Sequence, residues 1–108
     1  MELTGKDNGR KIFLDHGVLE LSIELEENPT TGYLWSVAEL PKKMVFNHSE
    51  LIKTDQKMAG ASSSRLLDFS IEAGANGKLR LHNCRPWQKD DIIETFEIEL
   101  VPSKPNGH

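Results

Sequence analysis

Apolar and polar side chains alternate with a period of two along several short stretches of this 108-residue chain. The clearest alternation lies in residues 18–26, where polar residues separate the apolar Leu19, Leu21, Ile23 and Leu25. A period of two places alternate side chains on opposite faces of a β-strand, and here it predicts a strand with one buried face. No segment shows a convincing helical period. The sequence therefore predicts an all-β fold.

Turn residues separate these stretches at intervals of roughly 8–12 residues, a spacing typical of a β-sandwich or a small barrel. Strands are expected at residues 11–14, 18–26, 34–40, 45–53, 67–71, 78–84 and 95–101. The Asn76-Gly77 pair is expected to close a β-hairpin between the fifth and sixth strands. Residues 1–10 are expected to be a loose segment, and residues 102–108 a disordered tail. The length predicts a single domain over residues 1–108.

Composition and charge exclude several classes of protein. The net charge is −4, and no cluster of Lys and Arg is dense enough to bind phosphates, so nucleic acid is not expected as a partner. No apolar run approaches the roughly 18 residues of a membrane span, so no membrane association is expected. The single cysteine, Cys84, excludes an intrachain disulfide. No secretory leader is recognisable, which makes the cytoplasm the default compartment; a removed leader would indicate a secreted, periplasmic or lysosomal protein.

Three loops are expected at one end of the fold if consecutive strands alternate in direction. They follow the second, fourth and sixth strands and cover residues 28–32, 58–64 and 85–91. Their composition is unusual, whereas the turns expected at the other end are ordinary and polar. A rigid sandwich that presents several loops at one end is a common binding architecture. We therefore expect the binding surface at these loops.

The first loop has the residue types of a rigid turn. Pro29 fixes its own φ angle, and the side chains of Asn28 and the two threonines can hydrogen-bond to nearby backbone. Gly32 permits a positive φ angle or a close approach of the backbone. An ordinary turn between strands uses the same residue types, so the loop alone leaves a structural and a functional interpretation open.

Considered with two later segments, the loop resembles the chagasin family of cysteine protease inhibitors. The resemblance covers about residues 11–100. It rests on Asn28-Pro29-Thr30-Thr31-Gly32-Tyr33, then on a small loop containing glycine, then on Arg85-Pro86-Trp87. The resemblance implies an immunoglobulin-like β-sandwich of about seven to eight strands, with three binding loops at one end. It also implies reversible, tight binding to papain-like cysteine proteases, whose active-site cleft the loops would block.

The resemblance assigns a role to each loop. The central loop, residues 28–32, would enter the protease cleft, with Thr30 and Thr31 beside the catalytic cysteine and histidine. Arg85, Pro86 and Trp87 would form a flanking loop, in which Trp87 packs on an aromatic residue of the enzyme.

The middle loop would lie along the enzyme through four small residues, Gly60, Ala61, Ser62 and Ser63. The family usually has Gly-x-Gly-Gly there, and only Gly60 matches that pattern. A position that requires a positive φ angle would be met poorly by a serine.

Several candidate residues also have a purely structural interpretation. Tyr33 and Trp35 begin a strand and are expected in the core or at its edge. Arg85 could form an internal salt bridge instead of a partner contact. Thr30 and Thr31 could cap the turn and do nothing more.

The chain is not expected to be an enzyme. Its four histidines lack the spacing of metal ligands, and Cys84 is most simply a small packed side chain. No cofactor or metal ion is expected, and a monomer is the default. The alternative function is an immunoglobulin-like adhesion or carbohydrate-binding module that uses the same loops on another partner.

Overall fold

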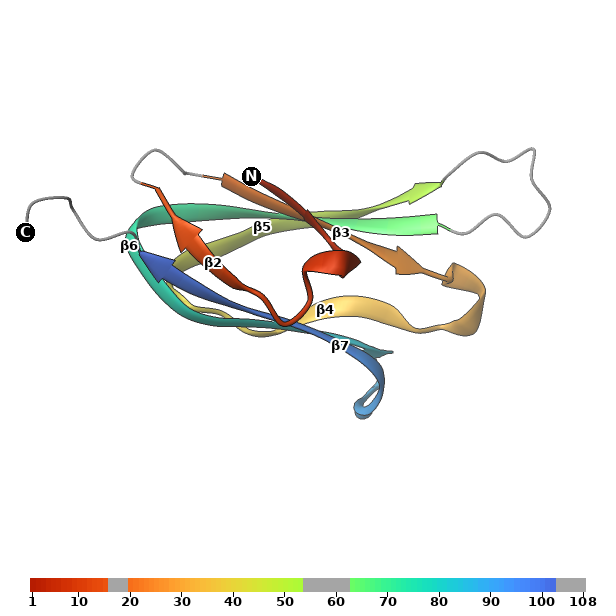
Figure 1. Ribbon diagram of the computed structural model, residues 1–108. Helices are drawn as coiled ribbons and strands as arrows, with labels where there is room; N and C mark the ends of the chain where they lie inside the picture. Colours follow the sequence, from red (N-terminus) through yellow and green to blue (C-terminus); the bar gives the residue numbers. More distant parts are fainter. Residues whose placement is uncertain (16–19, 54–62, 103–108) are drawn as a thin grey trace, which may run out of the picture.

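The structure is a computed structural model that describes residues 1–15, 20–53 and 63–102 (Figure 1). These residues form seven strands and two short 3-10 helices, and the prediction of an all-β, immunoglobulin-like sandwich is confirmed. The elements are β1 (Glu2–Thr4), η1 (Gly5–Asp7), β2 (Lys11–Leu14), β3 (Glu20–Glu27), η2 (Pro29–Thr31), β4 (Leu34–Glu39), β5 (Lys42–Lys53), β6 (Ser63–Arg85) and β7 (Gln88–Pro102). None of the helices in the described part is long or apolar enough to cross a membrane.

The sandwich has two layers that share the long strand β6. The first half of β6 pairs with β3 and β5, and β1 extends this layer by pairing with β3. The second half of β6 pairs with β4 and β7, and β2 extends this layer by pairing with β7. The β1–β3 and β2–β7 pairs are parallel, and the others are antiparallel. Figure 1 shows β6 curling over at one end to pass from one layer to the other.

The predicted hairpin at Asn76-Gly77 is wrong. β6 runs without interruption for 23 residues, and its two halves pair with different strands rather than with each other. The chain still reverses direction, because it bends at Gly74 and Gly77, whose φ angles are 87° and 119°. Ala75 is fully buried at the bend, so this segment closes the end of the sandwich. The second half of β6 therefore runs in the expected direction, but it pairs with β4 and β7 and not with the first half of β6.

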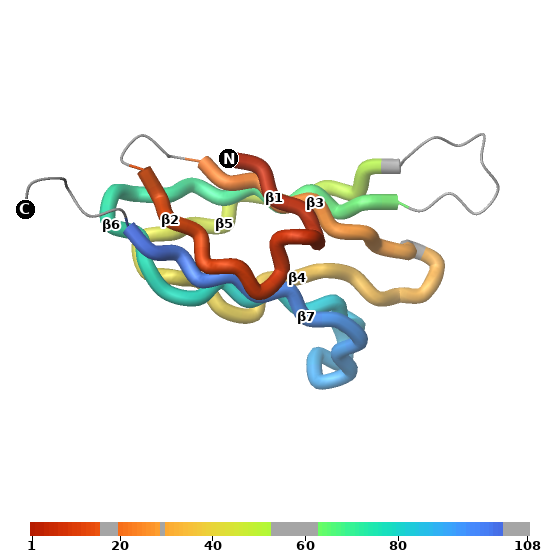
Figure 2. The backbone as a smooth tube through the Cα atoms, viewed as in Figure 1, coloured from red at the N-terminus to blue at the C-terminus, as the bar shows by residue number. Residues whose placement is uncertain are grey.

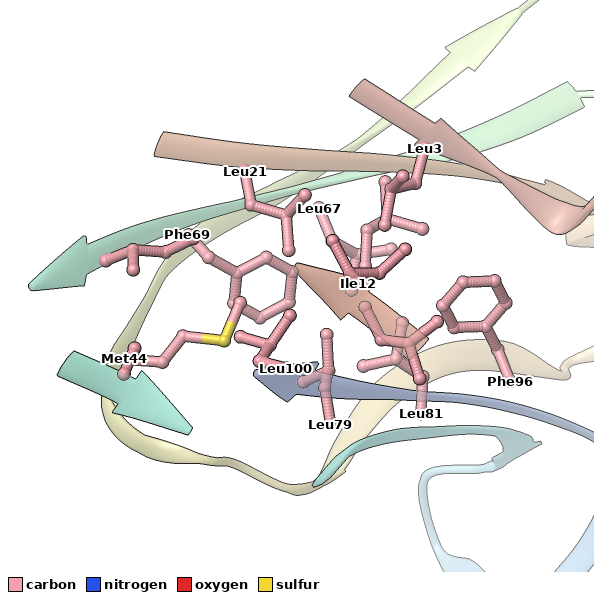
Figure 3. Packing of buried hydrophobic residues seen from close by; sticks show 14 of the residues in the cluster. Leu3, Ile12, Leu21, Met44, Leu67, Phe69, Leu79, Leu81, Phe96 and Leu100 are labelled. Carbon is pink, nitrogen blue, oxygen red and sulfur yellow. The ribbon is translucent and has the colours of Figure 1, made fainter. Parts of the chain in front are cut away.

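The core lies between the two layers and is built from the inward-facing residues of the strands (Figure 3). The alternation predicted for β3 is confirmed at Leu21, Ile23 and Leu25, which are buried. Phe69, Phe96, Leu67, Leu79, Leu81, Ile98 and Leu100 complete the centre of the core. Each such side chain contributes about 1.5–3 kcal/mol when fully buried. The sandwich thus has a rigid centre, and the turns at its ends are free for other roles.

The N-terminal segment is ordered, and the prediction that residues 1–10 are loose is wrong. β1 pairs with β3, and Leu3 is buried in the core. Thr4 and Asp7 form a capping box around η1, in which the Thr4 amide donates to Asp7 at 2.9 Å. This hydrogen bond, together with Arg10, lowers the pKa of Asp7. The Gly9 amide donates to the carbonyl oxygen of Glu97 on β7 at 2.6 Å, so the segment contacts the edges of both layers.

Candidate functional site

The described parts of the three loops lie at one end of the sandwich, which we call the loop end (Figure 2). The η2 turn joins β3 to β4 there, and a short turn joins β6 to β7. β5 ends and β6 begins at the same end, because Ser63 pairs with both Glu27 and Lys53. The predicted common position is confirmed for these segments. Gly60, Ala61 and Ser62 lie outside the described residues.

Side chains within the 28–32 loop hold it in one shape. Asn28 caps η2, and its Oδ1 accepts hydrogen bonds from the Thr30 amide at 3.1 Å and from Thr30 Oγ1 at 2.7 Å. Thr31 Oγ1 donates to the Asn28 carbonyl oxygen at 2.9 Å. Pro29 takes the first position of η2, where a missing N–H costs nothing. The loop is therefore shaped before any partner arrives.

These bonds determine what Thr30 and Thr31 can offer to a partner. Both hydroxyl protons point to oxygen acceptors within the loop, so each hydroxyl presents only lone pairs outward. Thr31 Oγ1 also accepts from the Tyr33 amide, at 3.3 Å. Both side chains are exposed. They cap the turn, as one interpretation expected, and they also leave an exposed row of hydrogen-bond acceptors.

The turn between β6 and β7 is shorter than the predicted 85–91 loop. β6 extends to Arg85 and β7 starts at Gln88, so only Pro86 and Trp87 stand outside the strands. We call residues 85–87 the 85–87 turn. Trp87 is 73% exposed, which is unusual for the largest side chain and agrees with the expectation that it does not belong to the core.

Arg85 points inward from the 85–87 turn. Its guanidinium carbon lies 4.7 Å from the centre of the Tyr33 ring, and Nη1 lies 3.6 Å from Asp91 Oδ2. Tyr33 donates its hydroxyl proton to the same Asp91 oxygen at 2.7 Å. That hydrogen bond raises the pKa of Tyr33, assisted by desolvation and opposed by the charge of Arg85. The internal interaction left open for Arg85 is thus present, and it ties the β6–β7 turn to the start of β4.

Gly32 joins the two turns. Its φ angle is 83°, a left-handed conformation that favours glycine. A Cβ atom at this position would lie 3.2 Å from Trp87 Cη2, closer than ordinary contact. The glycine therefore serves both the turn geometry and the approach of the indole ring. We call the 28–32 loop together with Trp87 the Gly32–Trp87 wedge.

The second loop is shorter than predicted at its C-terminal side. Ser63 and Ser64 are buried residues of β6, whereas the sequence placed both in a loop over residues 58–64. They pair with Glu27 and Glu26 of β3, which extends the sheet further than the composition indicated.

Sequence reasoning missed two groups at the loop end. Asp91 was placed in a loop, but it is the acceptor that links Tyr33 with Arg85. Glu27 was not considered, although the period of two that buries Leu25 also directs residue 27 inward. Trp35, in contrast, is buried as expected.

Comparisons with known proteins agree with this architecture. Residues 19–100 match the family described as chagasin family peptidase inhibitor I42. Chagasin from Trypanosoma cruzi is 28% identical over 91 residues, which are 80% of this chain and 82% of chagasin.

Solved structures share the fold. The crystal structure of the cysteine protease inhibitor EhICP2 from Entamoeba histolytica has a TM-score of 0.79 at 20% identity, covering 94% of both chains. The solution structure of amebosin has a TM-score of 0.70 at 23% identity, covering 94% of this chain and 96% of amebosin. PbICP-C, solved in complex with falcipain-2, has a TM-score of 0.51 at 20% identity, covering 89% of this chain and 91% of PbICP-C.

The family match covers most of the chain and includes the 28–32 loop and the 85–87 turn. The chain belongs to the chagasin family of peptidase inhibitors, and it is therefore an inhibitor and not an enzyme.

Proposed function

We propose that this protein reversibly inhibits papain-like cysteine proteases by laying its loop end across their active-site cleft. Family membership supports this proposal over an adhesion or carbohydrate-binding module. Two of the similar structures are described as a cysteine protease inhibitor and as a complex with falcipain-2. The observation that carries the proposal is the close approach of the Trp87 ring to Gly32, because it brings the two most distinctive segments of the sequence side by side.

The 28–32 loop is the part proposed to enter the cleft. Its internal hydrogen bonds fix its shape in the free protein, so little conformational entropy is lost on docking. The catalytic pair of a papain-like enzyme includes a histidine cation, which donates hydrogen bonds. The outward lone pairs of Thr30 and Thr31 are matched to such a donor.

The other two segments are proposed to flank the cleft. Trp87 would provide a large, rigid, exposed contact beside the loop, and tryptophan is among the residues most enriched at binding hot spots. Arg85 and Pro86 would hold the position of that ring. The second loop, with Gly60, Ala61 and Ser62, is proposed to contact the enzyme on the other side, whereas Ser63 is buried in β6 and is no longer a candidate contact.

Titration of papain activity with the purified chain tests the proposal. We expect stoichiometric loss of activity at sub-micromolar concentration, recovery of activity on dilution or competition with substrate, and an intact chain after prolonged incubation. A chain that is cleaved between residues 28 and 32, or that leaves papain and cathepsin-L-like enzymes fully active, would refute the proposal.

A further inference from the structure

We propose that Glu27 and Arg65 form a buried clamp that positions the 28–32 loop for protease binding, an inference that rests on the proposed function. Glu27 is the last residue of β3 and directly precedes Asn28. Arg65 is the third residue of β6, the strand that follows the second loop. The side chains are only 1% and 17% exposed, which is unusual for a charged pair.

The contacts of Glu27 close the base of the loop. Its Oε1 accepts a hydrogen bond at 2.7 Å from the amide of Trp35, the second residue of β4. The carboxylate therefore joins the strand that enters the loop to the strand that leaves it. The seven residues between them include the whole 28–32 loop, so the position of the carboxylate sets the separation of the loop ends.

The contacts of Arg65 hold that carboxylate in place. Nη2 donates to Glu27 Oε2 at 2.7 Å, and Nε lies 3.2 Å from both oxygens. Nη1 reaches Ser49 Oγ on β5 at 3.4 Å. The guanidinium thus fixes the rotation of the carboxylate through several donors, a geometry that an arginine provides and a lysine does not. Through these contacts the guanidinium links the base of the 28–32 loop to β5 and β6, the two strands that flank the second loop.

A role in positioning explains the pair better than a role in stability. Replacing a buried ion pair with apolar residues is often neutral or stabilising, because burial removes both charges from water. The main core cluster is apolar, and this pair lies where the first candidate binding loop begins and the second one ends. A second tie, from Trp35 Nε1 to the Glu26 carbonyl oxygen at 2.8 Å, keeps β3 and β4 together without Glu27. The clamp therefore adds precision to a junction that is already connected.

Affinity measurements on Arg65→Ala, Arg65→Lys and Glu27→Ala test the clamp. We expect both alanine variants to raise the Kd for papain by about tenfold to 100-fold, mainly through koff, the range for losing a charge-assisted hydrogen bond. Arg65→Lys should recover part of the loss, because it restores the charge without the forked geometry. Met44→Ala is the matched control: it removes a buried side chain near the opposite end and should lower stability while leaving Kd unchanged.

Amide hydrogen exchange of the free protein provides a second readout that does not depend on any protease. In Arg65→Ala, the amides of Thr31 and Trp35 should exchange faster, while the amides of β7 keep their protection. The clamp would be overturned if Arg65→Ala kept both the wild-type Kd for papain and the wild-type exchange rate of the Trp35 amide. Failure of the wild-type chain to inhibit any papain-like protease would instead refute the proposed function, and the exchange experiment would still decide the clamp.

Discussion

Gly32 satisfies two requirements of the wedge, a left-handed backbone and space for the Trp87 ring. Replacing it with alanine, together with a matched control, should separate the two. The left-handed backbone at φ 83° costs an alanine about 1–2 kcal/mol. The added Cβ would also stand 3.2 Å from Trp87 Cη2, so the ring must move by a few tenths of an ångström or more. Because Trp87 is exposed, the ring rather than the backbone is expected to move. Both the stability and the shape of the wedge should therefore change.

The expected loss of affinity follows from the value of the tryptophan. A buried aromatic anchor at an interface contributes about 2 kcal/mol or more. Displacing the ring without removing it should forfeit about 1–2 kcal/mol, which corresponds to about 5- to 30-fold in Kd. Chemical denaturation measures the change in stability, and inhibition of papain measures the change in Kd.

Gly9→Ala is the matched control. Gly9 has nearly the same φ angle, 85°, but nothing lies within 4 Å of a Cβ atom there. Both variants should therefore lose about 1–2 kcal/mol of unfolding free energy, and only Gly32→Ala should bind papain more weakly. Equal Kd values for Gly32→Ala and the wild type, with the expected loss of stability, would refute the idea that the Gly32–Trp87 contact shapes the binding surface.

Three further perturbations follow from the contacts. Trp87→Ala should weaken binding to papain by about 2 kcal/mol or more without lowering the melting temperature, and an unchanged Kd would contradict the anchor. Tyr33→Phe keeps the ring below Arg85 but removes the hydrogen bond to Asp91, so chemical denaturation should show a lower free energy of unfolding, and wild-type stability would count against this link. The hydrogen bond from Arg80, at 2.9 Å, lowers the pKa of Glu97. The stabilisation from this hydrogen bond is therefore fully present above the unfolded-state pKa of about 4.3 and is lost as the pH falls through the lower folded-state pKa. Glu97→Gln should flatten this part of a melting-temperature profile.

The sequence predicted the features that depend on local pattern. The alternation in β3 was sufficient to identify its buried face, since the period of a strand is fixed by its geometry. The shape of the 28–32 loop followed from Asn28, Pro29 and Gly32, whose preferences act over a few residues. The exposure of Trp87 followed from its place after a proline in a polar segment.

Features set by distant partners were missed. The Asn76-Gly77 pair indicated a turn, but packing between the layers decides whether two strands pair after it, and here they do not. The order in residues 1–10 depends on Leu3 entering a core built by other strands. Glu27 was overlooked because a charged residue suggests exposure, whereas Arg65, 38 positions away along the chain, makes burial possible. The contact between Gly32 and Trp87 likewise joins segments that are adjacent only after folding.

The most direct test of the account is a hydrogen-exchange footprint of the chain with and without papain, because it locates the binding surface without mutation. We expect slowed exchange in peptides that cover the 28–32 loop and the 85–87 turn. We expect no change at the opposite end, where β6 bends at Gly74 and Gly77. Protection confined to that bend or to the exposed edge of β5, with the wedge unaffected, would contradict the central claim.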